Sequence, residues 1–207
     1  GPRRQFRPRV RARQGHADSD DLSPARPGMK RRRVKITGIG FVTPAGVGRD
    51  AFSAGILSGK SFVDPITRFP QDAGPFVAAE VPRFNINEFI EDPAVGKLPR
   101  HTQFALVASS LAMQDAKIDR ASVALLDPLV ATGTSLMDSE VINKTIENVA
   151  LKGPRYGLAR VVFHGPVASV AAAVADQIGG GRTMSLQSAC CSGVDAIGYA
   201  SEVVSMG

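Results

Sequence analysis

The 207-residue chain carries 25 Lys and Arg against 19 Asp and Glu, a formal net charge of +6, and 43% of its residues are hydrophobic. This length allows a substantial core, and no apolar run approaches the length of a membrane span, so we expect a soluble protein. Eleven of the basic residues but only three of the acidic ones lie in residues 1–33. The remaining body is therefore close to neutral, and charge gives no argument for nucleic-acid binding.

Residues 1–33 are rich in Arg and Pro and poor in apolar side chains. They cannot bury enough surface to offset the entropy of ordering. We expect a disordered leader or an artificial extension, with Met29 as a candidate original start. A targeting peptide or an arm for an anionic partner are the alternatives, and Asp18, Asp20 and Asp21 weigh against the targeting peptide. We expect a cytoplasmic protein, or one of an organelle matrix if the leader is a targeting peptide.

The body, residues 34–207, begins with a predicted strand at Val34–Thr37 that enters a glycine-rich turn. Asp50–Ser58 has the pattern of a helix, with Gly59 as its stop. The helical spacing turns three residues inward: Phe52, Ile56 and Leu57. Six prolines in 64–99 then predict an irregular excursion, with a short strand near Val77–Val81.

Two helices and a strand are predicted in the middle of the chain. Thr102–Lys117 and Ser139–Leu151 carry apolar residues at helical spacing, and Ala124–Thr132 reads as a buried strand interrupted by Pro128. The residues expected to face inward are Phe104, Val107 and Leu111 in the first helix, and Ile142, Ile146 and Val149 in the second.

The last third alternates helix, strand and helix. Pro166 suits the first turn of a helix that carries Val167, Val170, Val174 and Ile178 on one face, and Gly179-Gly180-Gly181 ends it. Met184–Ala189 is predicted as a strand, and Ser192–Met206 as a helix that is largely buried because Asp195 and Glu202 are its only charges. Strands alternating with helices indicate an α/β layered fold with at least partly parallel pairing.

Several common motifs are absent. The Gly38-Ile39-Gly40 turn lacks the third glycine of a dinucleotide-binding loop, because Thr43 stands at that position. The triple glycine precedes a strand, so it is no phosphate cradle. A hydrolase nucleophile elbow needs glycines on both sides of Cys190, where the chain has Ser188 and Ser192.

Two adjacent cysteines, Cys190 and Cys191, lie between the last strand and the last helix. A disulfide between neighbours would be strained, so they indicate a reducing compartment. A thiol in front of a helix lies near unpaired N–H groups and the positive end of the dipole, which favour a nucleophilic thiolate. The residues alone leave an inert core thiol equally open. His101, expected at a helix start, and His164, expected in a loop, are not spaced to form a metal site with the cysteines, so no metal is expected.

Three segments resemble one family, in the right order across about 34–207. They read RRRVKITGIGFVTPAG, HTQFALVASSLAMQDA and SLQSACCSGVDAIGYA. The first resembles the opening strand and turn of the β-ketoacyl-acyl carrier protein synthases, the elongating condensing enzymes of the thiolase superfamily. The second resembles a helix of that family, and the third its nucleophile segment, T-A-C-x-S-G-x-x-A-I. The chain departs from the family at Gly179-Gly180-Gly181-Arg182, where G-x-R-G-P is usual, and at Val167, where the helix Asn is expected.

The resemblance implies a thiolase-like layered fold, of which this chain is the first of two halves. It identifies Cys190 as the acyl-accepting nucleophile, whose backbone N–H forms half of an oxyanion hole. Cys191, Ser192 and Gly193 then belong to the substrate-binding surroundings. The family needs no metal and no organic cofactor, because the thioester substrate is already activated.

The implied function is acyl transfer to Cys190 followed by decarboxylative condensation with malonyl-carrier protein, in fatty acid or polyketide synthesis. The catalytic histidines, the active-site lysine and the second oxyanion donor belong to the family's second half. We therefore expect an acyl carrier protein, a complementary C-terminal half, and a homodimer or a heterodimer with a related ketosynthase-like subunit as partners. The alternatives are a thiolase-superfamily acyltransferase that uses coenzyme A and a non-catalytic partner subunit. Cys190 weighs against the latter, because the inactive chain-length factor of aromatic polyketide systems lacks that cysteine.

Overall fold

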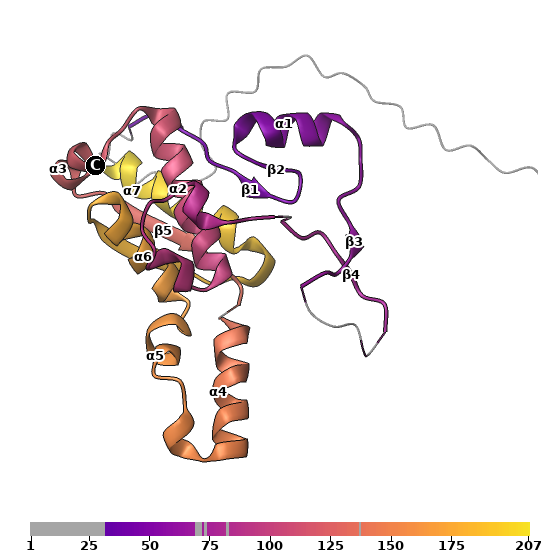
Figure 1. Cartoon of the computed structure of the whole chain (residues 1–207). Coiled ribbons are helices and arrows are strands. Elements are labelled where there is room, and N and C mark those ends of the chain that lie inside the picture. Colours follow the sequence, from indigo (N-terminus) through magenta and orange to yellow (C-terminus); the bar gives the residue numbers. More distant parts are fainter. Residues whose placement is uncertain (1–31, 69–71, 73, 82, 137) are drawn as a thin grey trace, which may run out of the picture.

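A computed structural model describes residues 32–68, 72, 74–81, 83–136 and 138–207 (Figure 1). The predicted leader thus lies outside the described residues, apart from Arg32 and Arg33. Among the described residues, none of the helices combines the length and the apolar character that a membrane crossing requires.

The centre of the fold is a parallel pair of strands, β5 (Leu129–Gly133) and β6 (Arg182–Leu186), aligned residue for residue. Parallel strands need a crossover connection, and here it is made by several helices, the last of which is α6 (Ala168–Ile178). This pairing confirms the predicted α/β class.

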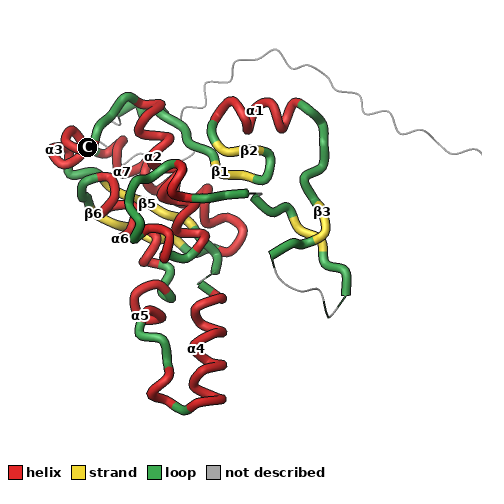
Figure 2. Tube along the Cα trace, viewed as in Figure 1, coloured by secondary structure: helices red, strands yellow, loops and turns green. Residues whose placement is uncertain are grey.

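The core lies between this strand pair, α6 and the long helix α2 (Arg100–Ala116). Helix α6 packs on the β5–β6 pair, and α2 packs against α6 (Figure 2). Both helices were predicted, and Gly179 ends α6 with φ of 109°, as expected of a glycine stop. The buried residues of this core are Ile86, Leu106, Val107, Val130, Ala171, Val174 and Ala175.

The predicted opening strand at Val34–Thr37 is wrong: in the part of the chain that the structure describes, these residues belong to no strand. Residues on either side of them bond to helices instead, since Arg32 N–H donates to the Ser205 carbonyl and Ile39 N–H to the Asp115 carboxylate. The segment runs against α2 so closely that a Cβ at Gly40 would lie 1.9 Å from a helix carbonyl oxygen.

A small hairpin of β1 (Val42–Thr43) and β2 (Gly46–Val47) follows, and then α1 (Arg49–Leu57). The predicted helix is confirmed, but only Phe52 of its three inward residues is partly buried, stacked on Phe41 at 4.2 Å. The other two, Ile56 and Leu57, are 57% and 85% exposed. Two-residue strands cannot cover a nine-residue helix, so the described residues leave the last turn of α1 without a neighbour to pack on.

The proline-rich excursion carries β3 (Asp64–Pro65), β4 (Val77–Ala78) and the 3-10 turns Ile86–Glu88 and Val95–Lys97. The short strand near Val77 is thereby confirmed. After α2, the predicted strand 124–132 is half wrong. Its beginning belongs to α3 (Arg120–Leu126), because the Asp119 carboxylate caps that helix by accepting from Ser122 N–H at 2.8 Å.

Helices α4 (Ser139–Lys152) and α5 (Arg160–His164), joined through the 3-10 turn Pro154–Tyr156, project from the body as an arm (Figure 1). Of the residues expected inward in α4, Ile142 is half-buried, but Ile146 and Val149 are 60% and 37% exposed. The arm projects from the body, and α4 packs against α5 and the 3-10 turn Pro154–Tyr156. These short elements leave part of its apolar side uncovered by the residues that the structure describes.

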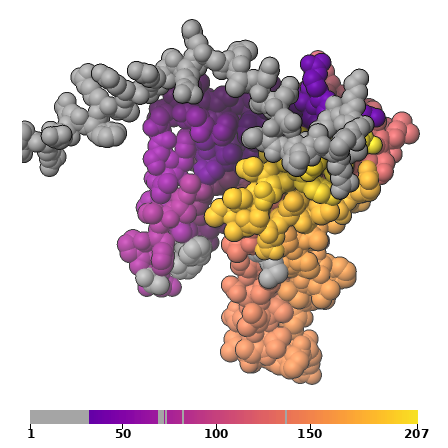
Figure 3. All heavy atoms as spheres, turned by 180° about the vertical axis from the view of Figure 1, so that it is seen from behind, coloured from indigo at the N-terminus to yellow at the C-terminus, as the bar shows by residue number. Residues whose placement is uncertain are grey.

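Helix α7 (Ser192–Met206) has the predicted boundaries, but the prediction that it is largely buried is wrong. Val194, Ile197 and Val204 are 73%, 68% and 55% exposed. The helix rests on the β5–β6 pair along one side only, and its opposite side has no cover from the described residues. Figure 3 shows this C-terminal segment at the molecular surface.

Candidate active site

The two cysteines lie in the turn that joins β6 to α7. After β6 ends at Leu186, a 3-10 turn spans Ala189–Cys191 and α7 begins at Ser192. Both thiols are free and exposed. The predicted order of strand, tight turn and helix is confirmed, but the strand is Arg182–Leu186 rather than Met184–Ala189, and Ala189 belongs to the 3-10 turn. Within this chain the turn leaves Cys190 at the surface and not in the core.

The residue before Cys190 has an unusual backbone. Ala189 has φ of 53°, in the left-handed region. A residue with a Cβ costs about 1–2 kcal/mol there, because its side chain approaches a carbonyl oxygen. The turn therefore persists only where neighbouring contacts hold it.

Ser192 supplies such contacts. Its hydroxyl donates to the Ala189 carbonyl oxygen at 2.7 Å and accepts from Ser188 N–H at 3.0 Å. The residue is 2% exposed. Ser188 is held a second time, because its own hydroxyl donates to the carboxylate of Asp195 on α7.

The end of strand β5 packs directly against this turn. A Cβ at Gly133 would lie only 2.0 Å from the carbonyl oxygen of Ser192, so the strand end and the first turn of α7 are in direct backbone contact. The Gln187 side chain donates to the Ser135 carbonyl at 3.1 Å, and Thr134 N–H donates to Leu186 at 3.2 Å. The loops that follow β5 and β6 thus fix each other.

The predicted site residues have different environments. Cys190, Cys191 and Gly193 are exposed, whereas the Ser192 side chain is buried and committed to the turn. The motif located Cys190 but did not point to Asp195, whose bond to Ser188 depends on the conformation of the turn. In the sequence, Asp195 is marked by its charge in the first turn of a largely apolar helix.

The two predicted histidines lie on other elements. His101 is the second residue of α2, as expected at a helix start. Burial lowers its pKa below the ordinary value, and the Asp138 carboxylate partly opposes this. His164 is the last residue of α5, so its assignment to a loop is wrong.

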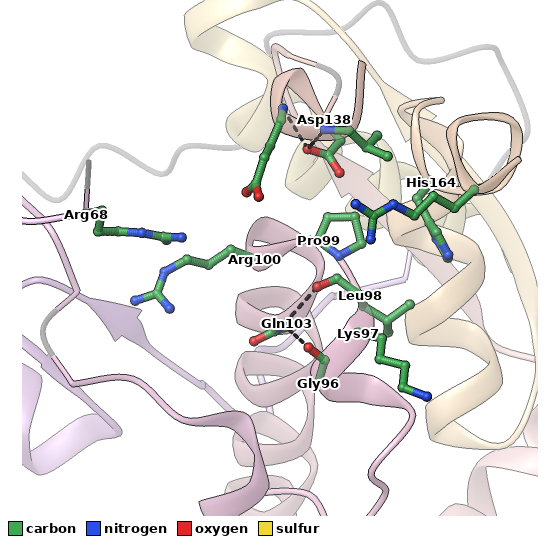
Figure 4. A pocket seen from close by; sticks show the side chains of 12 residues that line it. Arg68, Gly96, Lys97, Leu98, Pro99, Arg100, Gln103, Asp138 and His164 are labelled. Carbon is green, nitrogen blue, oxygen red and sulfur yellow. Dashed lines mark hydrogen bonds between the residues drawn. The ribbon is translucent and has the colours of Figure 1, made fainter. Parts of the chain in front are cut away.

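A cavity of about 590 Å³ lies between α2, the start of α4 and α5, and its lining includes neither cysteine. It is predominantly basic: Arg68, Lys97, Arg100, Arg160 and His164 line it, against Asp138 and Glu140. Figure 4 shows Arg68 and Arg100 on one side and His164 on the other.

Arg100 is anchored within that lining. Its guanidinium lies 5.2 Å from the ring centre of Phe84 and 5.0 Å from that of Phe104, and it donates to the Val81 carbonyl at 2.9 Å. Desolvation lowers its pKa below the ordinary value. These contacts attach the proline-rich excursion to α2, which indicates a structural part for Arg100.

Known proteins similar to this chain are condensing enzymes. Residues 31–207 match the family model described as "Beta-ketoacyl synthase, N-terminal domain". A "Putative polyketide beta-ketoacyl synthase 1" of Streptomyces cyaneus is 30% identical over 184 residues, covering 85% of this chain and 44% of the relative. The 3-oxoacyl-(acyl-carrier-protein) synthase 2 of Coxiella burnetii is 28% identical over 179 residues, covering 85% of this chain and 43% of that protein.

Solved structures give the same result. "The ishigamide ketosynthase/chain length factor" superposes with a TM-score of 0.77 at 25% identity, covering 84% of this chain and 44% of that one. These matches confirm the predicted thiolase-like fold and the assignment to an N-terminal half. The chain spans less than half the length of the relatives that it matches.

Proposed function

This chain belongs to the β-ketoacyl synthase family, the condensing enzymes of fatty acid and polyketide synthesis, and we propose that it supplies the acyl-accepting half of such an enzyme. One observation carries the proposal: Cys190 is a free, exposed thiol between β6 and α7, within the segment that resembles the family's nucleophile motif. A non-catalytic partner subunit would have no use for this thiol.

In the first half-reaction, the Cys190 thiolate attacks the carbonyl carbon of an acyl group carried as a thioester by a carrier protein. A new thioester to Cys190 forms, and the carrier thiolate leaves and takes up a proton. Malonyl-carrier protein then loses CO₂, and its enolate carbon attacks the acyl-Cys190 carbonyl. Cys190 is released as the thiolate, and a β-ketoacyl thioester remains on the carrier.

The developing oxyanion is stabilised by the backbone N–H of Cys190, assisted by the N-terminal end of the α7 dipole. Cys191 and Gly193 are exposed beside Cys190, which supports the proposal that they contact the acyl group bound there. Ser192 contributes through its backbone, because its hydroxyl is committed to the turn.

The second half of the enzyme supplies the catalytic histidines, the active-site lysine and the second oxyanion donor, in the same or another polypeptide. The chain's share of its relatives supports this division, since it covers 44% of the Streptomyces cyaneus protein. The complete enzyme is a homodimer or pairs with a related ketosynthase-like subunit, as the name of the ishigamide protein supports. It works without a metal or an organic cofactor, because the thioester is already activated.

The carrier protein docks at the basic cavity, where Lys97 and Arg160 offer charge to an acidic partner. Other basic residues are engaged elsewhere: Arg49 pairs with Asp115 at 3.0 Å, and Lys152 bonds Asn148 at the end of α4. Lys97→Glu is expected to raise the KM for acyl-carrier protein with little change in kcat, and Lys152→Glu, the matched control, to change neither. An unchanged KM in Lys97→Glu would place docking elsewhere.

The test of the reaction is acyl transfer to the intact protein, followed by peptide mapping by mass spectrometry. Acyl-carrier protein is expected to add one acyl group at Cys190, lost in Cys190→Ser and retained in Cys191→Ser. Faster transfer from acyl-coenzyme A would favour the coenzyme A-dependent alternative. If Cys190 is not acylated in the assembled enzyme, the result would favour the alternative of a non-catalytic partner subunit.

A further inference from the structure

The turn that carries Cys190 is attached to α7 by a small hydroxyl and carboxylate network. We propose that Ser188, Ser192 and Asp195 are positioning residues that hold Ala189 in its left-handed conformation, so that the Cys190 thiol rather than the Cys191 thiol is presented for reaction. The inference rests on the proposed function for its biological meaning, but the presentation of a thiol can be measured without any acyl donor.

The Ser192 hydroxyl bonds the backbone on both sides of Ala189. It accepts from Ser188 N–H and donates to the Ala189 carbonyl oxygen. One side chain thereby closes the turn around the strained residue. Because Ser192 is 2% exposed, water cannot easily replace either bond.

Asp195 holds the same turn from a second point on α7. Residues 192 and 195 are three apart on α7 and share a face of the helix. The Ser192 hydroxyl accepts from the Ser188 N–H, and the Asp195 carboxylate accepts from the Ser188 hydroxyl. Ser188 is therefore fixed at two points on one face of α7, which restricts the rotation of the turn.

The turn carries two thiols that could react. Cys190 and Cys191 are adjacent, both free and both exposed, so exposure alone does not select between them. Successive side chains in a turn point in different directions, and the backbone angles of the preceding residue decide which direction each takes. If Ala189 relaxes to the right-handed region, that selection is lost.

The experiment uses iodoacetamide on the intact native protein, with the ratio of alkylation at Cys190 to that at Cys191 read by peptide mapping. Asp195→Ala is expected to lower this ratio roughly fivefold, the effect of losing one hydrogen bond of ordinary strength, and Ser192→Ala, which loses two, to lower it at least as much. Ser192→Thr and Asp195→Asn, which keep a hydroxyl and an acceptor, should restore most of it. Because Asp195 is exposed, its variants retain the fold even if Ser192→Ala does not.

The matched control is Ser205→Ala, at the other end of α7. Ser205 is 9% exposed, and its hydroxyl donates to the Glu202 carbonyl at 2.8 Å, so the same kind of bond is lost far from the turn. It should leave the ratio unchanged. Equal ratios in Ser192→Ala, Asp195→Ala and Ser205→Ala would overturn the proposal, as would a wild-type ratio near one. Wild-type selectivity that is lost in the two alanine variants, without acylation by acyl-carrier protein, would support the network and reject the proposed function.

Discussion

Gly133 and Ser192 show how two residues from distant parts of the chain fix the turn that carries Cys190. The missing side chain of the first allows α7 to start directly on the end of β5, and the hydroxyl of the second closes the turn around Ala189. Neither residue needs to touch substrate to matter. Their contribution is the position of the Cys190 backbone.

Gly133→Ala is expected to destabilise the protein by about 1–3 kcal/mol, the usual cost of overpacking. The added Cβ would lie 2.0 Å from the backbone oxygen of Ser192, which cannot move without moving α7. Urea unfolding of the intact protein measures the change. Gly96→Ala is the control, since the Cβ added there would have its nearest neighbour, the Asn87 side-chain oxygen, at 3.9 Å. Equal stabilities of the two variants would show that α7 does not rest on Gly133.

His101 gives a prediction about pH. Burial lowers its pKa from the ordinary value of 6.5, so the unfolded chain binds the proton more readily than the folded one. The contribution of neutral, buried His101 to stability is therefore complete at a pH above 6.5 and is lost as the pH falls through the lower pKa of the folded state. The free energy of unfolding, measured with urea, should fall between about pH 7.5 and about pH 5.5, and this fall should be smaller in His101→Gln than in wild type. An equal fall would contradict this account.

The helices show which parts of the fold could be predicted from sequence. α2, α6 and α7 were found because each has a clear apolar period or a glycine stop. α3 was missed, since a short apolar run fits a strand as well as a helix and only Asp119 signals the cap. Periodicity also cannot tell whether a neighbour exists, which is why Ile146 and Val149 were expected inward and are exposed. The motif found Cys190, but the Ser188–Asp195 bond depends on backbone angles that no local pattern specifies.

The open side of α7 leads to a prediction about assembly. A single exposed leucine is ordinary, but several large apolar side chains along one helix mark a contact surface. Ile197→Asp is expected to lower the fraction of assembled protein on size-exclusion chromatography, because a charge would be buried there without a partner. Leu57→Asp, at an 85% exposed position on α1, is the control. Equal elution of both variants would mean that α7 faces solvent.

Over the whole molecule, apolar exposure is unevenly distributed. The core between α2, α6 and the β5–β6 pair is closed, whereas α7 and the arm are open: Val162 and Phe163 of α5 are 69% and 71% exposed. β6 has β5 as its one strand partner among the described residues, so a sheet edge is also free to pair. These surfaces suit a chain that folds against a complementary half.

Acyl transfer to Cys190 within a two-part enzyme can be tested by native mass spectrometry, before and after exposure to an acyl-carrier protein. We expect a complex that contains the complementary half, with one acyl increment that maps to Cys190. A monomeric, cooperatively folded and unmodified chain of residues 1–207 would contradict the proposal. The family fold would then remain without the proposed acyl transfer.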